Sequence, residues 1–341
     1  MGRDCDGGGN RYLSQIQLTA NHPLKASYPN RETLAAGVCS IQVARSDTPW
    51  IVCPRRLLVL GREGLGERVH QKSTEAKTLS ILGYPSGTKL GIWPEVKMKY
   101  VTDIDGLSVS IDYSFDYILM PLASVSQSEV EQLTGLSWTQ ARRNFEAGGY
   151  TSARRGDEYF IEDCPIGTPS VIEIMTSSTS GGNKSRRSTI PMAFEDAMLG
   201  KPHLAPGINY RQVWARMASQ LIAKSEIALS WAGKTIWVVQ DVLVDYISKT
   251  TALNVRHFLS QHTNQVNLLS FSYGEDFRRD SGVIDLPKAE LFSGPISSLP
   301  SDELKPQPSF QDIIRSPVSP PISYLRGLLS KRRPVNQVIV P

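Results

Sequence analysis

Residues 90–122 read LGIWPEVKMKYVTDIDGLSVSIDYSFDYILMPL, and this stretch decides the fold. Residues 90–100 have the composition of a β-strand, and residues 102–106 form a turn with an Asp-Gly step. Residues 107–122 return as one or two further strands. The pattern predicts a β-hairpin whose second strand continues into the buried centre of a sheet.

The segments that follow predict the rest of the sheet and its helices. Residues 126–150 carry two short apolar stripes at helical spacing, separated by Gly135. Residues 169–176 (PSVIEIMT) and 235–239 (TIWVV) predict buried strands, and residues 210–231 predict a helix between them. This order predicts an α/β protein with a mixed central sheet flanked by helices and a helical insertion.

Composition divides the chain into three regions. Residues 1–60 mix loops with short strands, and residues 61–285 contain the predicted sheet with its helical insert at about 126–150. Residues 286–341 are rich in Pro and Ser and contain the basic run 331–333. We expect this last region to be an extended basic tail or an arm that contacts a partner.

The overall charge and the cysteine content narrow the class of protein but do not name a function. The 341 residues include 37 Lys and Arg against 33 Asp and Glu, and this mild excess is compatible with nucleic-acid binding. No apolar run is long enough to cross a bilayer, and the polar opening residues predict no secretory signal. We therefore expect a cytoplasmic protein with no membrane partner. The four cysteines form no CxxC pair, so their spacing alone indicates no metal site.

Two carboxylates are candidates for catalysis. Asp116 stands directly before an apolar strand, and Glu173 lies inside the strand VIEIM, where a charge is costly to bury without a partner. Hydrolysis of a phosphodiester needs acidic ligands that hold Mg²⁺ and a group that activates water. The alternative is structural, with Glu173 paired to an arginine and Asp116 capping a turn.

The group that activates water is less evident. Two residues after Glu173 stands Met175, which neither binds Mg²⁺ well nor donates a proton. Glu95 and Lys97 share one face of the first hairpin strand and would point into the same site if that strand neighbours Asp116. A solvated hairpin face is the alternative interpretation of these two residues.

A polar loop follows Glu173 directly. Its small hydroxyl residues and glycines at 176–183 would let backbone N–H groups approach a phosphate, and Lys184, Arg186 and Arg187 add positive charge. The alternative is a flexible surface loop.

The helical insert is a second candidate for DNA contact. Residues 132–150 have the pattern of a helix-turn-helix whose second helix carries Arg142 and Arg143. Arginine is the residue type that most often reads guanine in the major groove. The alternative is a helical hairpin with no role in DNA recognition.

Taken in order, several of these pieces resemble the NotI family of type II restriction endonucleases. They span most of residues 37–250: GVC at 37–39, IVCPRR at 51–56, SFDYIL at 114–119, VIEIMT at 171–176, and a helix-strand-helix block at 206–247. The resemblance implies a PD-(D/E)xK nuclease core and a homodimer that cuts palindromic duplex DNA with Mg²⁺. It also implies that Asp116 and Glu173 are the metal-binding acids. A DNA methyltransferase encoded nearby would protect the host's own sites.

Two departures from the family pattern bear on these expectations. Nucleases of this class usually carry lysine at the position of Met175, and NotI itself has glutamine there, so Lys97 or Lys184 would have to assist the water. NotI also holds iron with four cysteines, and Cys39 and Cys53 match the last two. The first two have no clear match, although Cys5 and His22 lie upstream, so we do not expect a complete structural iron or zinc site.

Three functions remain from the sequence. The first is a Mg²⁺-dependent restriction endonuclease that cuts both strands. The second is a sequence-specific DNA-binding protein without cleavage, which would use the helical insert and which Met175 favours. The third is a nuclease with the same core that acts on flaps or junctions.

Overall fold

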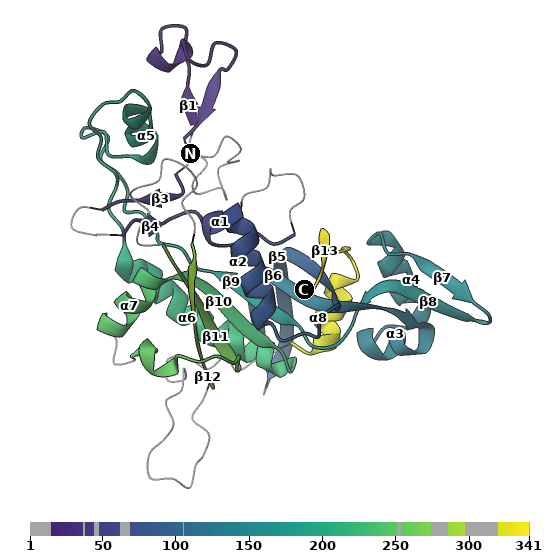
Figure 1. The fold of residues 1–341 in the computed structure, drawn as a ribbon. Helices are drawn as coiled ribbons and strands as arrows, with labels where there is room; N and C mark the ends of the chain where they lie inside the picture. Colours follow the sequence, from purple (N-terminus) through teal and green to yellow (C-terminus); the bar gives the residue numbers. More distant parts are fainter. Residues whose placement is uncertain are drawn as a thin grey trace, which may run out of the picture.

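The computed structural model describes residues 15–36, 38–43, 48–61, 69–104, 106–250, 254–273, 286–296 and 320–340. Within these residues a nine-stranded mixed sheet forms the centre of the protein, and helices pack on it (Figure 1). Seven strands lie side by side in the order β12-β11-β10-β9-β6-β5-β13, and β8 pairs with the end of β6 and with β7. The seven are β5 (Lys89–Ile104), β6 (Leu107–Ser126), β9 (Ser170–Ile174), β10 (Lys234–Gln240), β11 (Val266–Ser272), β12 (Lys288–Gly294) and β13 (Asn336–Ile339).

The predicted hairpin is confirmed as β5 and β6. The two strands pair antiparallel from Leu90 opposite Pro121 to Ile104 opposite Leu107. The backbone N–H of Gly106, whose φ is +78°, donates to the carboxylate of Asp103 at 3.0 Å and closes the turn. β9 then pairs antiparallel with β6 and parallel with β10, so the expected mixed sheet is confirmed.

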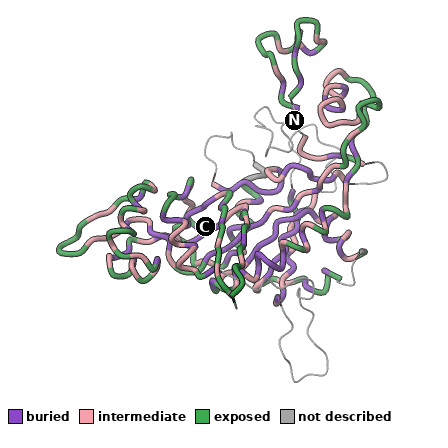
Figure 2. Tube along the Cα trace, turned by 180° about the vertical axis from the view of Figure 1, so that it is seen from behind, coloured by how far each residue is buried: buried purple, intermediate pink, exposed green. Residues whose placement is uncertain are grey.

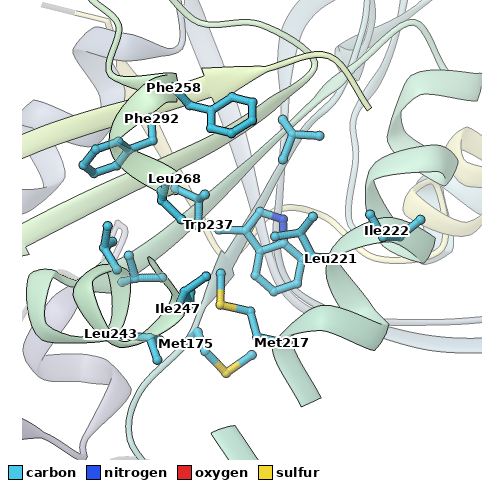
Figure 3. Close-up of a cluster of buried hydrophobic side chains, with 14 of the residues drawn as sticks. Met175, Met217, Leu221, Ile222, Trp237, Leu243, Ile247, Phe258, Leu268 and Phe292 are labelled. Carbon is cyan, nitrogen blue, oxygen red and sulfur yellow. The ribbon is translucent and has the colours of Figure 1, made fainter. Parts of the chain in front are cut away.

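Helices cover both faces of the sheet. The parallel connection from β9 to β10 passes through α6 (Tyr210–Ser230), which packs on one face with α7 (Asp241–Thr250) around the indole of Trp237 (Figure 3). On the other face, α1 (Pro54–Leu57) and α2 (Val69–Ile81) contribute to a cluster that includes Leu57, Leu79 and Ile236. Burial of each such side chain contributes about 1.5–3 kcal/mol, so these two layers stabilise the strands that carry the candidate site.

Residues 127–165 form a lobe beside the sheet, which we call the insert lobe (Figure 1). The two predicted helices are confirmed as α3 (Gln127–Thr134) and α4 (Trp138–Ala147), which begin after Ser126 and Ser137. A hairpin that the sequence analysis did not predict, β7 (Ser152–Arg155) with β8 (Glu158–Pro165), completes the lobe. Its own apolar cluster includes Val130, Phe145 and Ile161.

The expectation of an extended tail from residue 286 is wrong for the described part of that region. β12 pairs with β11, α8 (Ile322–Leu329) packs on the sheet, and β13 pairs with β5. Leu325 and Leu329 are almost completely buried, and the indole N–H of Trp93 donates to the carbonyl of Arg332 at 2.9 Å. The Pro- and Ser-rich composition predicted no helix here, although Leu325 and Leu329 of α8 have the i and i+4 spacing of a buried helix face.

The N-terminal region forms smaller units at the edge of the molecule. β1 (Gln15–Gln17) and β2 (Thr33–Ala35), with the 3-10 helix Pro23–Lys25 between them, pack against α5 (Ile190–Met198) through Leu24 and Phe194. β3 (Ser40–Ile41) and β4 (Trp50–Ile51) form a short hairpin that leads into α1. The 3-10 helix Val255–Phe258 follows α7. Among the described residues, no helix combines the length and the apolar character needed to cross a membrane.

Candidate active site

Three carboxylates stand in a row across three neighbouring strands. The ladder pairs on either side of Glu95 place it opposite Asp116, on β5 and β6. The ladder between β6 and β9, extended by one residue, places Asp116 opposite Glu173. The sequence predicted Asp116 and Glu173 as a pair and Glu95 as a neighbour on condition that its strand lies beside Asp116, and the structure meets that condition.

The backbone of Glu95 is unusual for a strand. Its φ is +51°, in the left-handed region that a residue with a side chain rarely adopts. Such a conformation costs on the order of 1–3 kcal/mol and persists where the surroundings enforce it, often at functional sites. The side chain of Glu95 is exposed, so this end of the row is open to solvent.

Asp116 and Glu173 are joined by hydrogen bonds through the backbone. The N–H of Asp116 donates to Oε1 of Glu173 at 3.3 Å, and the N–H of Ile174 donates to Oδ2 of Asp116 at 2.7 Å. Glu173 is 3% exposed, whereas Asp116 is only partly buried. The two carboxylates are therefore held side by side in fixed orientations, with Glu173 at the closed end of the row.

A lysine that the sequence analysis did not select completes the site. Nζ of Lys224, on α6, donates to Oε2 of Glu173 at 2.5 Å and to the carbonyl of Ser114 at 2.7 Å. The ammonium also lies 5.5 Å from the centre of the Phe115 ring. Among the described residues, Lys224 is the lysine that forms an ion pair with these acids, and it is as deeply buried as Glu173.

One feature of the helix could have revealed Lys224. The apolar stripe of α6 runs through Met217, Leu221 and Ala228, and the seven-residue step between the last two passes over Lys224. Three and four residues are the steps that keep side chains on one helix face. A lysine at that position is a charge on the buried face of a helix, and such a charge needs a partner.

The electrostatics of the site disfavour the charged forms of both acids. Burial raises the pKa of Glu173, and the neighbouring Asp116 raises it further, while Lys224 acts in the opposite direction. Burial also raises the pKa of Asp116; Glu95 adds to this effect, and the hydrogen bond from Ile174 opposes it. Both acids thus bind a proton more readily than free carboxylates do, and a positive ion between them would relieve the same repulsion.

The donor set suits Mg²⁺ with open coordination positions better than a closed structural site. Mg²⁺ prefers oxygen ligands and is usually held by one or two carboxylates, with water and substrate phosphates completing its shell. Asp116 and Glu173 supply two such carboxylates. Within the described part of the chain, no group of three or more His, Cys, Asp or Glu residues could hold a metal ion by themselves. A metal at this site would therefore depend on water or substrate for most of its ligands.

The other candidates for assisting the water have different surroundings. Met175 is 6% exposed and packs beside Met217 near the indole of Trp237 (Figure 3). Lys97 is exposed on β5, opposite Ser114 in the ladder. Lys184 is exposed on the loop that follows β9. Among the described residues, neither Lys97 nor Lys184 forms an ion pair with Asp116 or Glu173.

The basic residues predicted to bind DNA differ in their surroundings. Arg187 is engaged within the protein, because its guanidinium contacts Asp196 at 2.8 Å and Glu195 at 3.1 Å. Lys184 and Arg186, on the same loop, are exposed. This loop therefore offers two of its three predicted cations to a ligand.

In the insert lobe, Nε of Arg142 contacts Glu146 at 2.8 Å, and its guanidinium lies 5.3 Å from the centre of the Tyr159 ring. Arg143 is exposed and, with Trp138, lines a shallow groove along α4. The lobe surface is largely exposed or half-exposed (Figure 2). Arg143 is thus the more accessible of the two arginines.

The structure brings the backbones of Cys39 and Cys53 together. The N–H groups of Val52 and Cys53 both donate to the carbonyl of Cys39, at 3.0 and 3.3 Å, and neither cysteine forms a disulfide. His22 instead contacts Glu195 at 3.2 Å. Cys5 lies outside the described residues. In the described part, the two cysteines alone do not make a metal site.

Comparisons with known proteins leave the family open. No protein-family model matches the chain, and no curated protein or solved structure matches it either. The resemblance to the NotI family therefore stays a prediction from the sequence.

Proposed function

We propose that the protein is a Mg²⁺-dependent endonuclease that hydrolyses phosphodiester bonds in both strands of duplex DNA. The observation that carries this proposal is the buried ion pair of Glu173 with Lys224, held beside Asp116 at the point where the antiparallel hairpin meets the parallel strands. The chain order supports it: helix α2, strands β5, β6 and β9, crossing helix α6, strand β10. A mixed sheet flanked by helices is compatible with the PD-(D/E)xK core that the resemblance implies.

Stability alone does not account for the site. Replacing a buried ion pair with apolar residues of similar volume is often neutral or stabilising by about 1–4 kcal/mol. Here the sheet also carries a strained Glu95 and a second carboxylate beside the pair. Groups with perturbed pKa values concentrate at functional sites because chemistry requires them there.

Each acid has a defined part in the proposed reaction. Asp116 and Glu173 would hold Mg²⁺, which on binding neutralises charge on the phosphate and lowers the pKa of bound water. The N–H of Ile174 orients Asp116, and Lys224 orients Glu173. Glu95, exposed at the open end of the row, would be accessible to a metal-bound water or to the DNA.

Recognition of DNA is assigned to exposed cations outside the acid row. Lys184 and Arg186 are exposed on the loop that follows β9, so they are suited to contact phosphates of a bound duplex. Arg143, with Arg142 behind it, would read bases from the insert lobe. Cleavage of both strands of a palindrome would be performed by a homodimer, with a cognate methyltransferase protecting the host DNA.

A second candidate function is sequence-specific DNA binding without cleavage. The observation that favours it is the position of Met175, whose side chain is committed to the apolar cluster around Trp237. If cleavage requires a lysine at position 175, the protein would bind DNA through the loop after β9 and the insert lobe and would leave the DNA uncut.

The test is incubation of the purified full chain with unmethylated phage DNA in the presence of Mg²⁺, Ca²⁺ or EDTA. Asp116→Asn and Glu173→Gln remove the proposed ligands with little change of shape. Asp112→Asn is the matched control, because Asp112 is an exposed acid on the same strand.

Discrete fragments that require Mg²⁺, vanish in the first two variants and persist in the control would support the endonuclease. Selective retention of DNA fragments without cleavage would support the binding protein. Absence of both would refute the two functions together.

A further inference from the structure

We propose that Lys224 positions the attacking water, so that helix α6 supplies the cation that is absent at Met175, directly after β9. This inference rests on the proposed function and identifies a residue for the same site. It makes the endonuclease chemically complete without Lys97 or Lys184.

The hydrogen bonds of Lys224 leave one donor for a ligand. An ammonium has three N–H donors. Within the described residues, two of them are directed at Oε2 of Glu173 and at the carbonyl of Ser114. The third can donate to a water or to a phosphate oxygen beside the acid row. Because Glu173 is itself a proposed metal ligand, that water lies next to the metal position.

The surroundings of Lys224 hold the ammonium in place before any ligand binds. Its stem is 4% exposed, on a helix that packs against the sheet, and its head is fixed by two acceptors on β6 and β9. A donor that is held in a water-excluded site acts on a developing charge without a reorganisation cost. An exposed lysine such as Lys97 or Lys184 would first have to be ordered.

The positions of the other residues are consistent with this assignment. Met175 directly follows β9, two residues after Glu173, yet it lies in the apolar cluster with Met217 and Trp237. Lys224 lies on the same helix as Met217, seven residues further on. α6 therefore covers both the apolar end of β9 and its acid, and it presents a lysine only to the acid.

The reaction can be written with all atoms accounted for. The water oxygen forms a new bond to phosphorus, and the bond from phosphorus to the oxygen of the leaving nucleotide breaks. The proton of the attacking water passes to solvent, and the leaving oxygen takes up a proton from solvent. Lys224 stays an ammonium throughout: it orients the water by donating a hydrogen bond and stabilises the negative charge that develops on the phosphate.

Lys224→Met tests the assignment, since methionine matches the length of the stem and removes the charge. Lys224→Arg retains the charge. Lys234→Met is the matched control, because Lys234 is a half-buried lysine in the same sheet that donates to Leu82 and Thr263 instead of to the acids. Each variant is checked for folding by thermal unfolding and then compared in three measurements. These are the single-turnover cleavage rate, DNA affinity in Ca²⁺, and Ca²⁺ affinity without DNA.

We expect Lys224→Met to lower the single-turnover rate at least 100-fold while DNA affinity changes less than threefold. Ca²⁺ affinity should rise about tenfold, because a competing positive charge beside Glu173 is gone. Lys224→Arg should retain part of the rate, and Lys234→Met should retain all of it. A purely structural lysine would reduce DNA affinity and cleavage together.

The failures of the two proposals are distinguishable. If the wild type cuts DNA and Glu173→Gln does not, but Lys224→Met cuts at the wild-type rate, the role of Lys224 is refuted and the endonuclease stands. If the wild type cuts no DNA, the endonuclease itself is refuted. Should Lys224→Met not fold, Lys224→Arg decides, since a single-turnover rate identical to wild type would contradict a positioned ammonium.

Discussion

Lys224 and Glu173 form a nearly inaccessible ion pair, with Nζ 2.5 Å from Oε2 and side-chain exposures of 5% and 4%. The two residues come from different layers, one from the helix that crosses over the sheet and one from the strand beneath it. Formation of the pair therefore depends on docking of α6. The site exists only in the folded protein.

The ion pair predicts that the protein is more stable when the charges of Lys224 and Glu173 are both present or both removed than when only one of them is removed. Lys224→Met leaves Glu173 buried beside Asp116 without its cation, and such losses cost about 3–5 kcal/mol. Adding Glu173→Gln to Lys224→Met removes the unpaired charge and should restore most of that loss. Urea unfolding of the wild type, both single variants and the double variant measures the coupling. Additive effects of the two substitutions would contradict the prediction.

The central sheet could be predicted because its signals are local. The Asp-Gly turn between residues 90 and 122 and the apolar runs at 169–176 and 235–239 each specify an element within a few residues. The acids at 116 and 173 stood out for the same reason, as single charges next to apolar strand residues. These parts of the fold and of the site needed no knowledge of distant contacts.

The rest depends on pairings across long stretches of chain. Glu95 faces Asp116 only through the strand register, which a one-residue shift would change. Asn336 pairs with Ile92, and nothing in the sequence around residue 336 indicates that partner. Lys224 was missed for two reasons. A single polar residue does not break the apolar pattern of a helix, and the partner of Lys224, Glu173, lies 51 residues earlier in the chain.

The C-terminal strand is predicted to loosen in acid. Asp163, on β8, contacts Lys89 at 2.6 Å, and Arg333 and Gln337 each at 3.1 Å. Burial by itself would raise the pKa of Asp163, but these three partners outweigh it and the net shift is downward. A lowered pKa in the folded protein means that the stabilisation is complete above about pH 4, the ordinary range of aspartate, and is lost as pH falls below it.

Asp163→Asn should reproduce the acid effect at neutral pH. Asparagine tolerates the φ of +56° at this position, so the backbone is preserved while the charge is removed. The partners are largely exposed, and exposed pairs contribute at most about 1 kcal/mol, so global stability should change little. Hydrogen exchange of the β13 amides should accelerate in the variant and become less sensitive to acid. Unchanged exchange would show that Asp163 does not anchor the strand.

The insert lobe gives a prediction about sequence recognition. Arg143 is exposed on α4, and a bidentate contact to guanine contributes about 1–3 kcal/mol of discrimination. Arg143→Ala should therefore weaken binding of the preferred site about 10- to 100-fold and leave binding of unrelated DNA nearly unchanged. Lys77→Ala, at an exposed lysine on α2, is the control. Equal weakening on all DNA, with a reduced dependence on salt, would instead assign Arg143 to a phosphate.

The loop after β9 offers a matched pair of adjacent glycines. A Cβ on Gly182 would lie 2.4 Å from the carbonyl oxygen of Ser188, whereas a Cβ on Gly181 meets nothing within 4 Å. Gly182→Ala must therefore displace the backbone that carries Lys184 and Arg186, at a cost of about 1–3 kcal/mol typical of overpacking. If these cations contact phosphates, Gly182→Ala should reduce DNA affinity several-fold and flatten its salt dependence, while Gly181→Ala behaves as wild type. Fluorescence anisotropy with a labelled duplex in Ca²⁺ measures both quantities. Identical affinities for the two variants would remove this loop from the DNA-binding surface.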